Sequence, residues 1–275
     1  MSIGHRVNPG SSIDLMKVDP GEASLSKEDA KLKAAELAER LRELLELMYA
    51  AGQHALLVVL QGRDTAGKDG TIRLLLDAVN VQGNRVASFK APSQIELSHD
   101  FLWRVHRETP AKGTMTIFNR SHYEDVLVVR VHDLVPRAVW SKRYDHINAF
   151  ESLLVASGTL VVKFMLHVSK DEQERRLRER EEDTTKAWKL SVGDWQEREF
   201  WDEYTEAYED ALRECSTEDA PWIVVPADKK WFRDIVVLQN LVEALEPHEK
   251  TWRESLRKLG EKALVELKAF RAKAN

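Results

Sequence analysis

The stretch LLVVLQGRDTAGKDG (residues 56–70) carries residue types that bind phosphate in proteins. Gly62, Gly67 and Lys68 have the spacing G-x-x-x-x-G-K of a phosphate-binding loop, and the loop follows an apolar run and precedes a helical pattern. In such a loop the lysine adds a positive charge, while backbone N–H groups face the phosphates. We expect those N–H groups to include the ones of Ala66 and Gly70.

One position departs from this motif, because Asp69 stands where Ser or Thr ordinarily supplies a hydroxyl to Mg²⁺. A carboxylate is also a good ligand for Mg²⁺, and Asp64 is a second carboxylate in the same loop. Both carboxylates would repel naked phosphate, so a bridging divalent cation is expected. We predict that the loop carboxylates bind the metal, directly or through water. Asp64 is also a candidate to receive the proton of an attacking acceptor group.

A second polar stretch, TIFNRSHYEDVLVVR (residues 116–130), runs from the end of a predicted strand into a helical pattern. Catalytic groups gather at such strand ends in open α/β sheets. The candidates are Asn119, Arg120, Glu124 and Asp125. Arg120 suits bidentate phosphate contact, and the two acidic residues are predicted to join the metal site or to orient Arg120. For Arg130, a phosphate contact and a surface ion pair are equally good interpretations.

A third cluster lies between residues 169 and 199 and is rich in arginine and glutamate. Its cations are Arg175, Arg176, Arg178, Arg180, Lys186 and Lys189. Interleaved glutamates favour a solvated helix with ion pairs between residues four apart. In a P-loop kinase, however, this region is a lid whose arginines neutralise the phosphoryl group in flight. Arg176 and Arg180 share a helix face and are the first candidates, with Lys189 as a further phosphate contact.

Five strand-like runs alternate with helical patterns along the chain, at residues 55–61, 85–91, 113–119, 159–168 and 221–227. This alternation predicts a five-stranded parallel sheet with helices on both faces, in one α/β P-loop kinase domain over residues 26–247. A helix is expected from Ser26 to near Gly52, a lid at about 169–193, and an irregular arm at 1–25. Residues 248–275 predict an amphipathic helix that packs on its own domain or forms an oligomer contact.

The bulk composition limits the function further. The net charge is −5 over 275 residues, which argues against general affinity for nucleic acid. No apolar run approaches the roughly 18 residues of a membrane span, and no signal peptide is evident at the N-terminus. The single cysteine, Cys215, excludes an intramolecular disulfide framework. A cytoplasmic enzyme without a membrane partner is the expectation, and an anionic substrate must be bound by locally concentrated cations.

Five segments together resemble the family-2 polyphosphate kinases, over roughly residues 25–247. They are GRDTAGKDG, FNRSHYEDVLVVRV, KFMLHVSKDEQERRLRER, WKL and PWIVVPADKKWFR. In that family the residue after the loop lysine is Asp, so the resemblance accounts for Asp69. It places Asp64, Lys68 and Asp69 on the family's loop, Arg120 on its second motif, and Arg176 and Arg180 on its lid.

The resemblance implies transfer of the terminal phosphoryl group of inorganic polyphosphate to an adenine or guanine nucleotide, with Mg²⁺ or Mn²⁺. It also implies a thymidylate-kinase-like fold with a small helical lid, and a homo-oligomer, either dimer or tetramer. The run FNRSHYEDV is similar to the branch that phosphorylates both AMP and ADP, whereas the lid sequence is similar to other branches. The main alternative, an ATP-dependent nucleoside monophosphate kinase, predicts Ser or Thr after Lys68. A nucleotide-binding regulatory module would not need Lys68 or the lid arginines.

Overall fold

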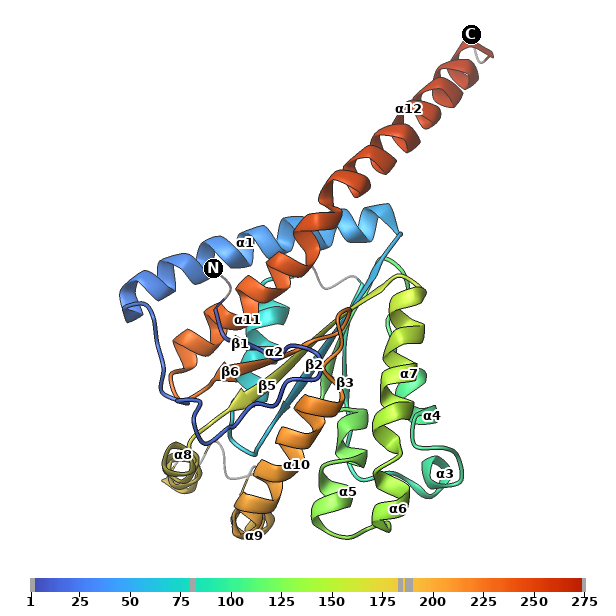
Figure 1. Ribbon diagram of the computed structural model, residues 1–275. Helices are drawn as coiled ribbons and strands as arrows, with labels where there is room; N and C mark the ends of the chain where they lie inside the picture. Colours follow the sequence, from blue (N-terminus) through green and yellow to red (C-terminus); the bar gives the residue numbers. More distant parts are fainter. Residues whose placement is uncertain (1–2, 80–82, 183–184, 186–189, 274–275) are drawn as a thin grey trace.

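The computed structural model describes residues 3–79, 83–182, 185 and 190–273. Its centre is a six-stranded sheet with the order β1-β6-β5-β2-β4-β3 (Figure 1). The strands are β1 (His5–Arg6), β2 (Ala55–Gly62), β3 (Asn84–Ser88), β4 (Met115–Asn119), β5 (Thr159–His167) and β6 (Trp222–Pro226). Strands β2 to β6 pair in parallel, as the five apolar runs predict. The prediction of five strands omitted β1, a two-residue edge strand from the N-terminal arm that pairs antiparallel with β6.

The central strand β2 is buried along its whole length, and its side chains alternate between two hydrophobic cores. Leu56, Val58 and Leu60 face α1 (Lys27–Ala51), α2 (Lys68–Asp77) and α11 (Lys230–Leu245). Leu57 and Val59 face the opposite core, to which α7 (Arg143–Ala156) and α10 (Trp201–Glu214) contribute. Figure 1 views the sheet nearly from its edge and shows helices on both sides of it, with α1, α2 and α11 on one side and α7 and α10 on the other. The carboxyl ends of the parallel strands therefore meet at one edge of the sheet.

The first helix begins and ends as its sequence predicts. The hydroxyl of Ser26 accepts a hydrogen bond from the backbone N–H of Asp29, and Gly52 ends α1 in the left-handed conformation, with φ 59°. The apolar stripe of α1, which includes Leu41, Leu44 and Met48, packs into the first core.

Two stretches between the strands form single helical turns instead of one continuous helix. Between residues 94 and 106 the chain forms α3 (Gln94–Leu97) and α4 (Trp103–His106), because the Asp100 carboxylate accepts from the N–H of Leu102 and closes a turn between them. After β4 the chain forms a 3₁₀ turn η1 (His122–Asp125), then α5 (Val128–Val131) and α6 (Arg137–Trp140) before α7. Asp133, with φ 49°, and Pro136 interrupt the helix there.

The predicted lid region forms α8 (Lys170–Glu182), α9 (Val192–Gln196) and the 3₁₀ turn η3 (Glu197–Phe200). Figure 1 shows α8 and α9 at the same end of the molecule as the loop between β2 and α2. Most of the connection between α8 and α9, including Lys186 and Lys189, lies outside the described residues.

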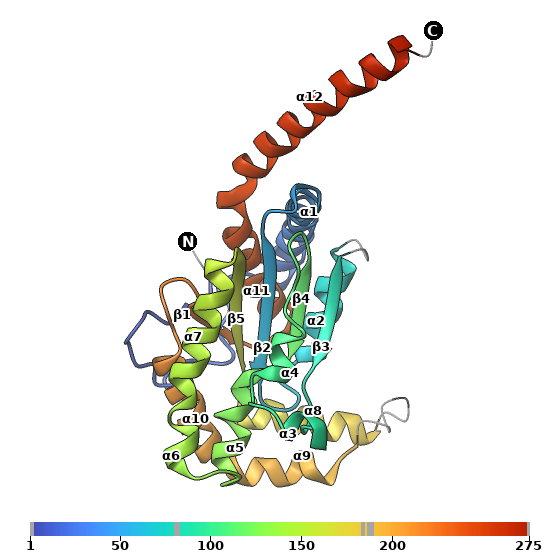
Figure 2. The same ribbon diagram turned by 90° about the vertical axis from the view of Figure 1, so that its right-hand side faces the viewer.

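At the other end, a 3₁₀ turn η4 (Glu246–His248) leads into the last helix, α12 (Glu249–Lys273), which projects from the body in both views (Figures 1 and 2). Trp252 is fully buried and donates from Nε1 to His54 Nδ1 over 3.0 Å. Beyond Leu256 the apolar stripe is exposed, with Leu259 at 63% and Phe270 at 72%. The amphipathic helix therefore packs on its own domain only through its first turns. None of the helices in the described part of the chain is long and apolar enough to cross a membrane.

Candidate functional site

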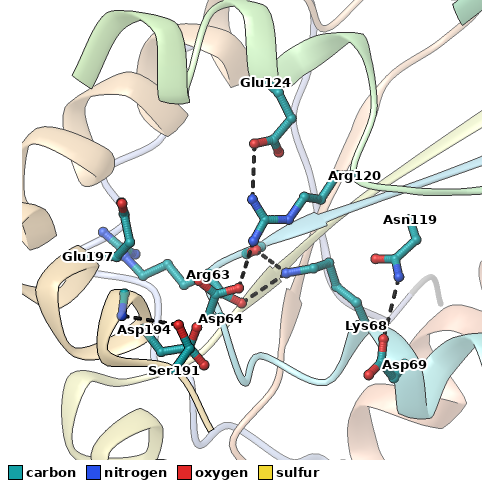
Figure 3. A network of polar contacts seen from close by, with 12 residues as sticks. Arg63, Asp64, Lys68, Asp69, Asn119, Arg120, Glu124, Ser191, Asp194 and Glu197 are labelled. Atoms are coloured by element: carbon teal, nitrogen blue, oxygen red, sulfur yellow. Dashed lines mark hydrogen bonds and ion pairs between the residues drawn. The ribbon is translucent and has the colours of Figure 1, made fainter. Parts of the chain in front are cut away.

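The glycine-rich loop connects β2 to α2 at the carboxyl edge of the sheet, as its motif predicts. Gly62 has φ 149° and Gly67 has φ 108°, which are conformations that glycine adopts far more readily than other residues. Lys68 begins α2 and its side chain turns back over the loop. Its Nζ donates to the carbonyls of Gly62 (2.6 Å) and Arg63 (3.1 Å), as Figure 3 shows. Burial lowers the pKa of Lys68, whereas the nearby carboxylate of Asp64 acts in the opposite direction.

Arg120 joins the second polar stretch to this loop. The first residue after β4, it has a left-handed backbone with φ 60°. Its guanidinium donates to Asp64 (2.8 Å) and to Glu124 (3.4 Å) (Figure 3). Burial alone would lower the pKa of Arg120, but Glu124 and Asp64 raise it above the ordinary value, so the side chain stays charged. The structure thus brings Asp64, Lys68, Arg120 and Glu124 together from two elements.

Asp69 lies in the first turn of α2, on the other side of Lys68 from Asp64 (Figure 3). The amide of Asn119 donates to its carboxylate over 3.4 Å, which orients Asp69 toward the end of β4. No group of three or more His, Cys, Asp or Glu side chains in the described residues could hold a metal ion alone. A divalent ion here would therefore complete its shell with water and phosphate oxygens, which is how Mg²⁺ usually binds with one or two carboxylates.

Asp125 and Arg130 lie apart from this group. Arg143 donates to both the carboxylate and the backbone oxygen of Asp125, each over 2.9 Å, and burial raises the pKa of Asp125 to about 6. The prediction that Asp125 orients Arg120 is wrong, because Glu124 has that contact. Arg130 forms an ion pair with Asp210 (2.5 Å), which is one of the two interpretations of this residue from the sequence.

The two predicted lid arginines differ in what they contact. Arg176 is buried and donates to the carbonyls of Thr65 (2.9 Å), Ala227 (2.7 Å) and Asp228 (2.8 Å). Arg176 therefore links the loop to residues 227–228 and does not project over the loop as a lid residue would. Arg180 pairs with Asp194 of α9 over 3.0 Å. Burial raises the pKa of Asp194, and the carboxylate of Asp64 raises it further. Figure 3 shows Asp194 on the same side of the loop as Asp64. Lys189 lies outside the described residues.

Sequence reasoning missed the specific contacts of two arginines that shape the loop. Arg63 stacks on Trp201, with Cζ 3.8 Å from the ring centroid, and donates to the Trp201 carbonyl and the Thr205 hydroxyl, each over 2.6 Å. Burial lowers the pKa of Arg63 to about 10. Arg233 of α11 lies against Gly67, where an added Cβ would be 2.0 Å from Nη1. The only sequence signal for this contact is Gly67 itself, because a residue without a Cβ lets another side chain approach its backbone this closely.

The site therefore combines the N-terminus of α2, one buried lysine and one arginine with acidic groups on both sides. Positive charge and backbone N–H groups at a helix N-terminus bind phosphate, and the carboxylates suit a divalent ion that bridges them to phosphate oxygens. Such a combination serves phosphoryl transfer, in which positioning and charge neutralisation supply most of the catalysis.

The comparisons with known proteins agree with this chemistry. The family model of polyphosphate kinase 2 (PPK2) matches residues 24–253. The AMP/ADP-polyphosphate phosphotransferase of Meiothermus ruber is 54% identical over 245 residues, which are 88% of this chain and 92% of that protein. The ADP-polyphosphate phosphotransferase of Rhodopseudomonas palustris is 45% identical over 257 residues, 88% of each. The crystal structure of polyphosphate kinase 2 from Arthrobacter aurescens TC1 matches with a TM-score of 0.85 at 46% identity, over 88% of each chain.

Proposed function

This chain belongs to the polyphosphate kinase 2 family, and we propose that it transfers the terminal phosphoryl group of inorganic polyphosphate to AMP and to ADP. One observation carries the proposal: at the N-terminus of α2, Lys68 bonds to the loop carbonyls and Arg120 pairs with the loop carboxylate Asp64, with Asp69 in place of the usual hydroxyl. This arrangement fits a polyanionic donor that is bound through cations, loop N–H groups and a metal bridge.

In the proposed reaction, the end of the polyphosphate chain lies over the loop, where backbone N–H groups and Lys68 face its oxygens. A phosphate oxygen of AMP or ADP attacks the terminal phosphorus, and the bond from that phosphorus to the bridging oxygen breaks. The chain leaves shortened by one phosphate. Arg120 and Arg180 are proposed to neutralise the negative charge that the transferred group carries, with Arg180 supplied by α8 of the lid.

The donor set also fits Mg²⁺ or Mn²⁺. Asp64 and Asp69 flank Lys68, and Glu124 lies on the far side of Arg120 (Figure 3). We propose that Asp64 or Asp69 binds the ion directly, with phosphate oxygens and water completing its shell, and that the other loop carboxylate and Glu124 contact the ion through water. When bound, the ion would withdraw negative charge from the phosphate oxygens. Asp125 is not part of this set, because Arg143 occupies its carboxylate.

The proposed acceptor range rests on the relative from Meiothermus ruber, whose name includes both AMP and ADP, and on the FNRSHYEDV run. A site that serves both acceptors must place nucleotides of two lengths at one transfer point. Such a site would bind the phosphates of the nucleotide more strongly than its base, so we expect weak discrimination between adenine and guanine.

The test is a time course with purified protein, Mg²⁺, excess polyphosphate and AMP, in which ADP and ATP are separated by chromatography. ADP should rise first and then decline as ATP appears. ADP that accumulates without ATP would restrict the acceptor to AMP. No product from either acceptor, together with turnover when ATP replaces polyphosphate as donor, would contradict the proposed donor. The predicted homo-oligomer is tested separately by light scattering.

A further inference from the structure

A buried polar cluster lies directly beneath the segment that carries Arg120 and Glu124. It consists of the side chains of His122, Tyr123, Glu151 and Lys163 and the backbone carbonyl of Cys215. Each of the four side chains is at most 1% exposed. The cluster draws on four elements, since η1, α7, β5 and the end of α10 each supply a member. None of these groups takes part in the proposed phosphoryl transfer.

Lys163 is the centre of the cluster. Its Nζ donates to Glu151 Oε2 (2.5 Å), to the Tyr123 hydroxyl (2.8 Å) and to the Cys215 carbonyl (2.6 Å). An ammonium group has three donors, so all of them are used. The Tyr123 hydroxyl in turn donates to Glu151 Oε1 over 2.8 Å. His122 Nε2 lies 3.1 Å from the same oxygen.

The cluster is electrically balanced, because one carboxylate faces one ammonium group. Burial lowers the pKa of His122, which favours the neutral ring, and its Nδ1 has no partner. The proton of that neutral ring therefore belongs on Nε2, where it is donated to Glu151. A buried ion pair is weak evidence for stability, because apolar side chains often replace such pairs without loss of stability. The candidate role of this pair is therefore the selection of one conformation.

The cluster holds one conformation of the turn that follows β4, and this turn carries Arg120 and Glu124 of the site. Ser121, His122 and Tyr123 separate Arg120 from Glu124 in the sequence. Ser121 is itself fully buried, and its hydroxyl accepts from Gln61 (3.0 Å), the residue that precedes the first glycine of the loop. The backbone of Arg120 is left-handed, with φ 60°, a conformation that costs about 1 kcal/mol for a residue with a Cβ and that persists only where the surroundings enforce it.

We propose that Tyr123, Glu151 and Lys163 are positioning residues, which hold the turn so that Arg120 reaches Asp64 and, during the reaction, the phosphate. This inference rests on the proposed function and deepens it, because it identifies what keeps Arg120 in a strained backbone conformation beside the loop. The cluster acts through Arg120 and touches neither polyphosphate nor nucleotide.

The test uses Tyr123→Phe, which removes one hydroxyl and leaves the pair between Glu151 and Lys163 in place. The matched control is Ser216→Ala, which also removes one buried hydroxyl. Ser216 donates to the Val7 carbonyl (2.5 Å) and accepts from the Trp222 N–H (3.0 Å). Because it follows Cys215, its substitution removes a buried hydroxyl next to the cluster but none of the bonds of the cluster side chains. Both variants should unfold at similar temperatures. Tyr123→Phe should lose about tenfold or more in kcat, whereas Ser216→Ala should stay within about twofold of the parent chain.

A cycle with Arg120→Ala separates positioning from a general structural role. Binding of inorganic tripolyphosphate with Mg²⁺ is measured by calorimetry in the parent chain, in each single variant and in the double variant. If the cluster acts through Arg120, then Arg120→Ala should weaken binding by about tenfold in the parent and by much less in the Tyr123→Phe background. Additive losses, or a folded Tyr123→Phe variant with parental kcat, would overturn the inference.

If Tyr123→Phe does not fold, the double substitution Glu151→Gln and Lys163→Met replaces it, because it removes both charges together and retains an oxygen for Tyr123. The same cycle with Arg120→Ala then decides. Binding of tripolyphosphate requires no turnover. A parent chain that fails to phosphorylate AMP or ADP would refute the proposed function, while the binding cycle would still decide the positioning role.

Discussion

Gly67→Ala should destabilise the protein more than its backbone conformation alone requires. Gly67 has φ 108°, and a Cβ there would lie 2.0 Å from Nη1 and 3.1 Å from Cζ of Arg233. Arg233 is only 4% exposed, and its Nη2 pairs with Asp234 over 2.5 Å, so it has little room to move. Left-handed strain costs about 1–2 kcal/mol. Displacing a hydrogen bond of a charged group costs about 1.5–3 kcal/mol more.

The expected total is about 2.5–5 kcal/mol, which corresponds to a fall in Tm on the order of 10 °C for a chain of this size. Gly52→Ala is the matched control, because Gly52 also has a positive φ, 59°, but a Cβ there meets nothing within 4 Å. It should lose only the strain, about 1 kcal/mol. Scanning calorimetry measures both variants. In an Arg233→Ala background, Gly67→Ala should also cost only the strain. Equal Tm shifts for the two alanine variants in the parent chain would refute the contact with Arg233.

Three further predictions follow from the site and the core. Lys68→Met should lower turnover by at least about a hundredfold, because a charge contact to the transferring group is lost. Its Tm should change little, since the substitution also removes a buried charge. Near-parental initial rates would contradict the role of Lys68 in turnover. Asp64→Asn should slow turnover and move the Mg²⁺ titration to higher concentration. If both the titration and the turnover were unchanged, Asp64 would be neither a ligand nor a base. Burial raises the pKa of the Cys215 thiol to about 12, so its contribution to stability is present below pH 9 and is lost as pH rises toward 12. Iodoacetamide at pH 8 should therefore label Cys215 slowly in the native protein and quickly in denaturant; rapid native labelling would show that the thiol is accessible.

The sequence predicted the parts of the fold that local patterns determine. The loop motif and the five apolar runs each lie within a few residues, so spacing alone identifies Lys68 and the parallel strands. Strand β1 could not be predicted in this way, because two residues carry no periodicity. His5 and Arg6 become a strand only because β6 offers them an edge.

The site was predicted less completely, because side-chain direction depends on distant contacts. Arg176 and Arg180 follow from helix periodicity, but the carbonyls that bind Arg176 belong to residues 65, 227 and 228. Glu124 and Asp125 are neighbours in a single 3₁₀ turn, yet Glu124 pairs with Arg120 and Asp125 pairs with Arg143. The chain enters this turn through Arg120, whose backbone is left-handed. No local pattern specifies that backbone angle.

From the partners of Arg120 we predict that a divalent ion strengthens the binding of polyphosphate. Arg120 is occupied by Asp64 and Glu124, so an incoming phosphate must compete with two carboxylates for the same guanidinium. A metal ion that takes Asp64 would release Arg120 to the phosphate. Asp64→Asn should then act in opposite directions on two measurements: tripolyphosphate should bind more tightly than to the parent chain when Mg²⁺ is absent, while turnover with Mg²⁺ should fall. Calorimetry in the presence of a chelator measures the first. Weaker binding of tripolyphosphate by Asp64→Asn without metal would show that Asp64 does not compete with phosphate for Arg120.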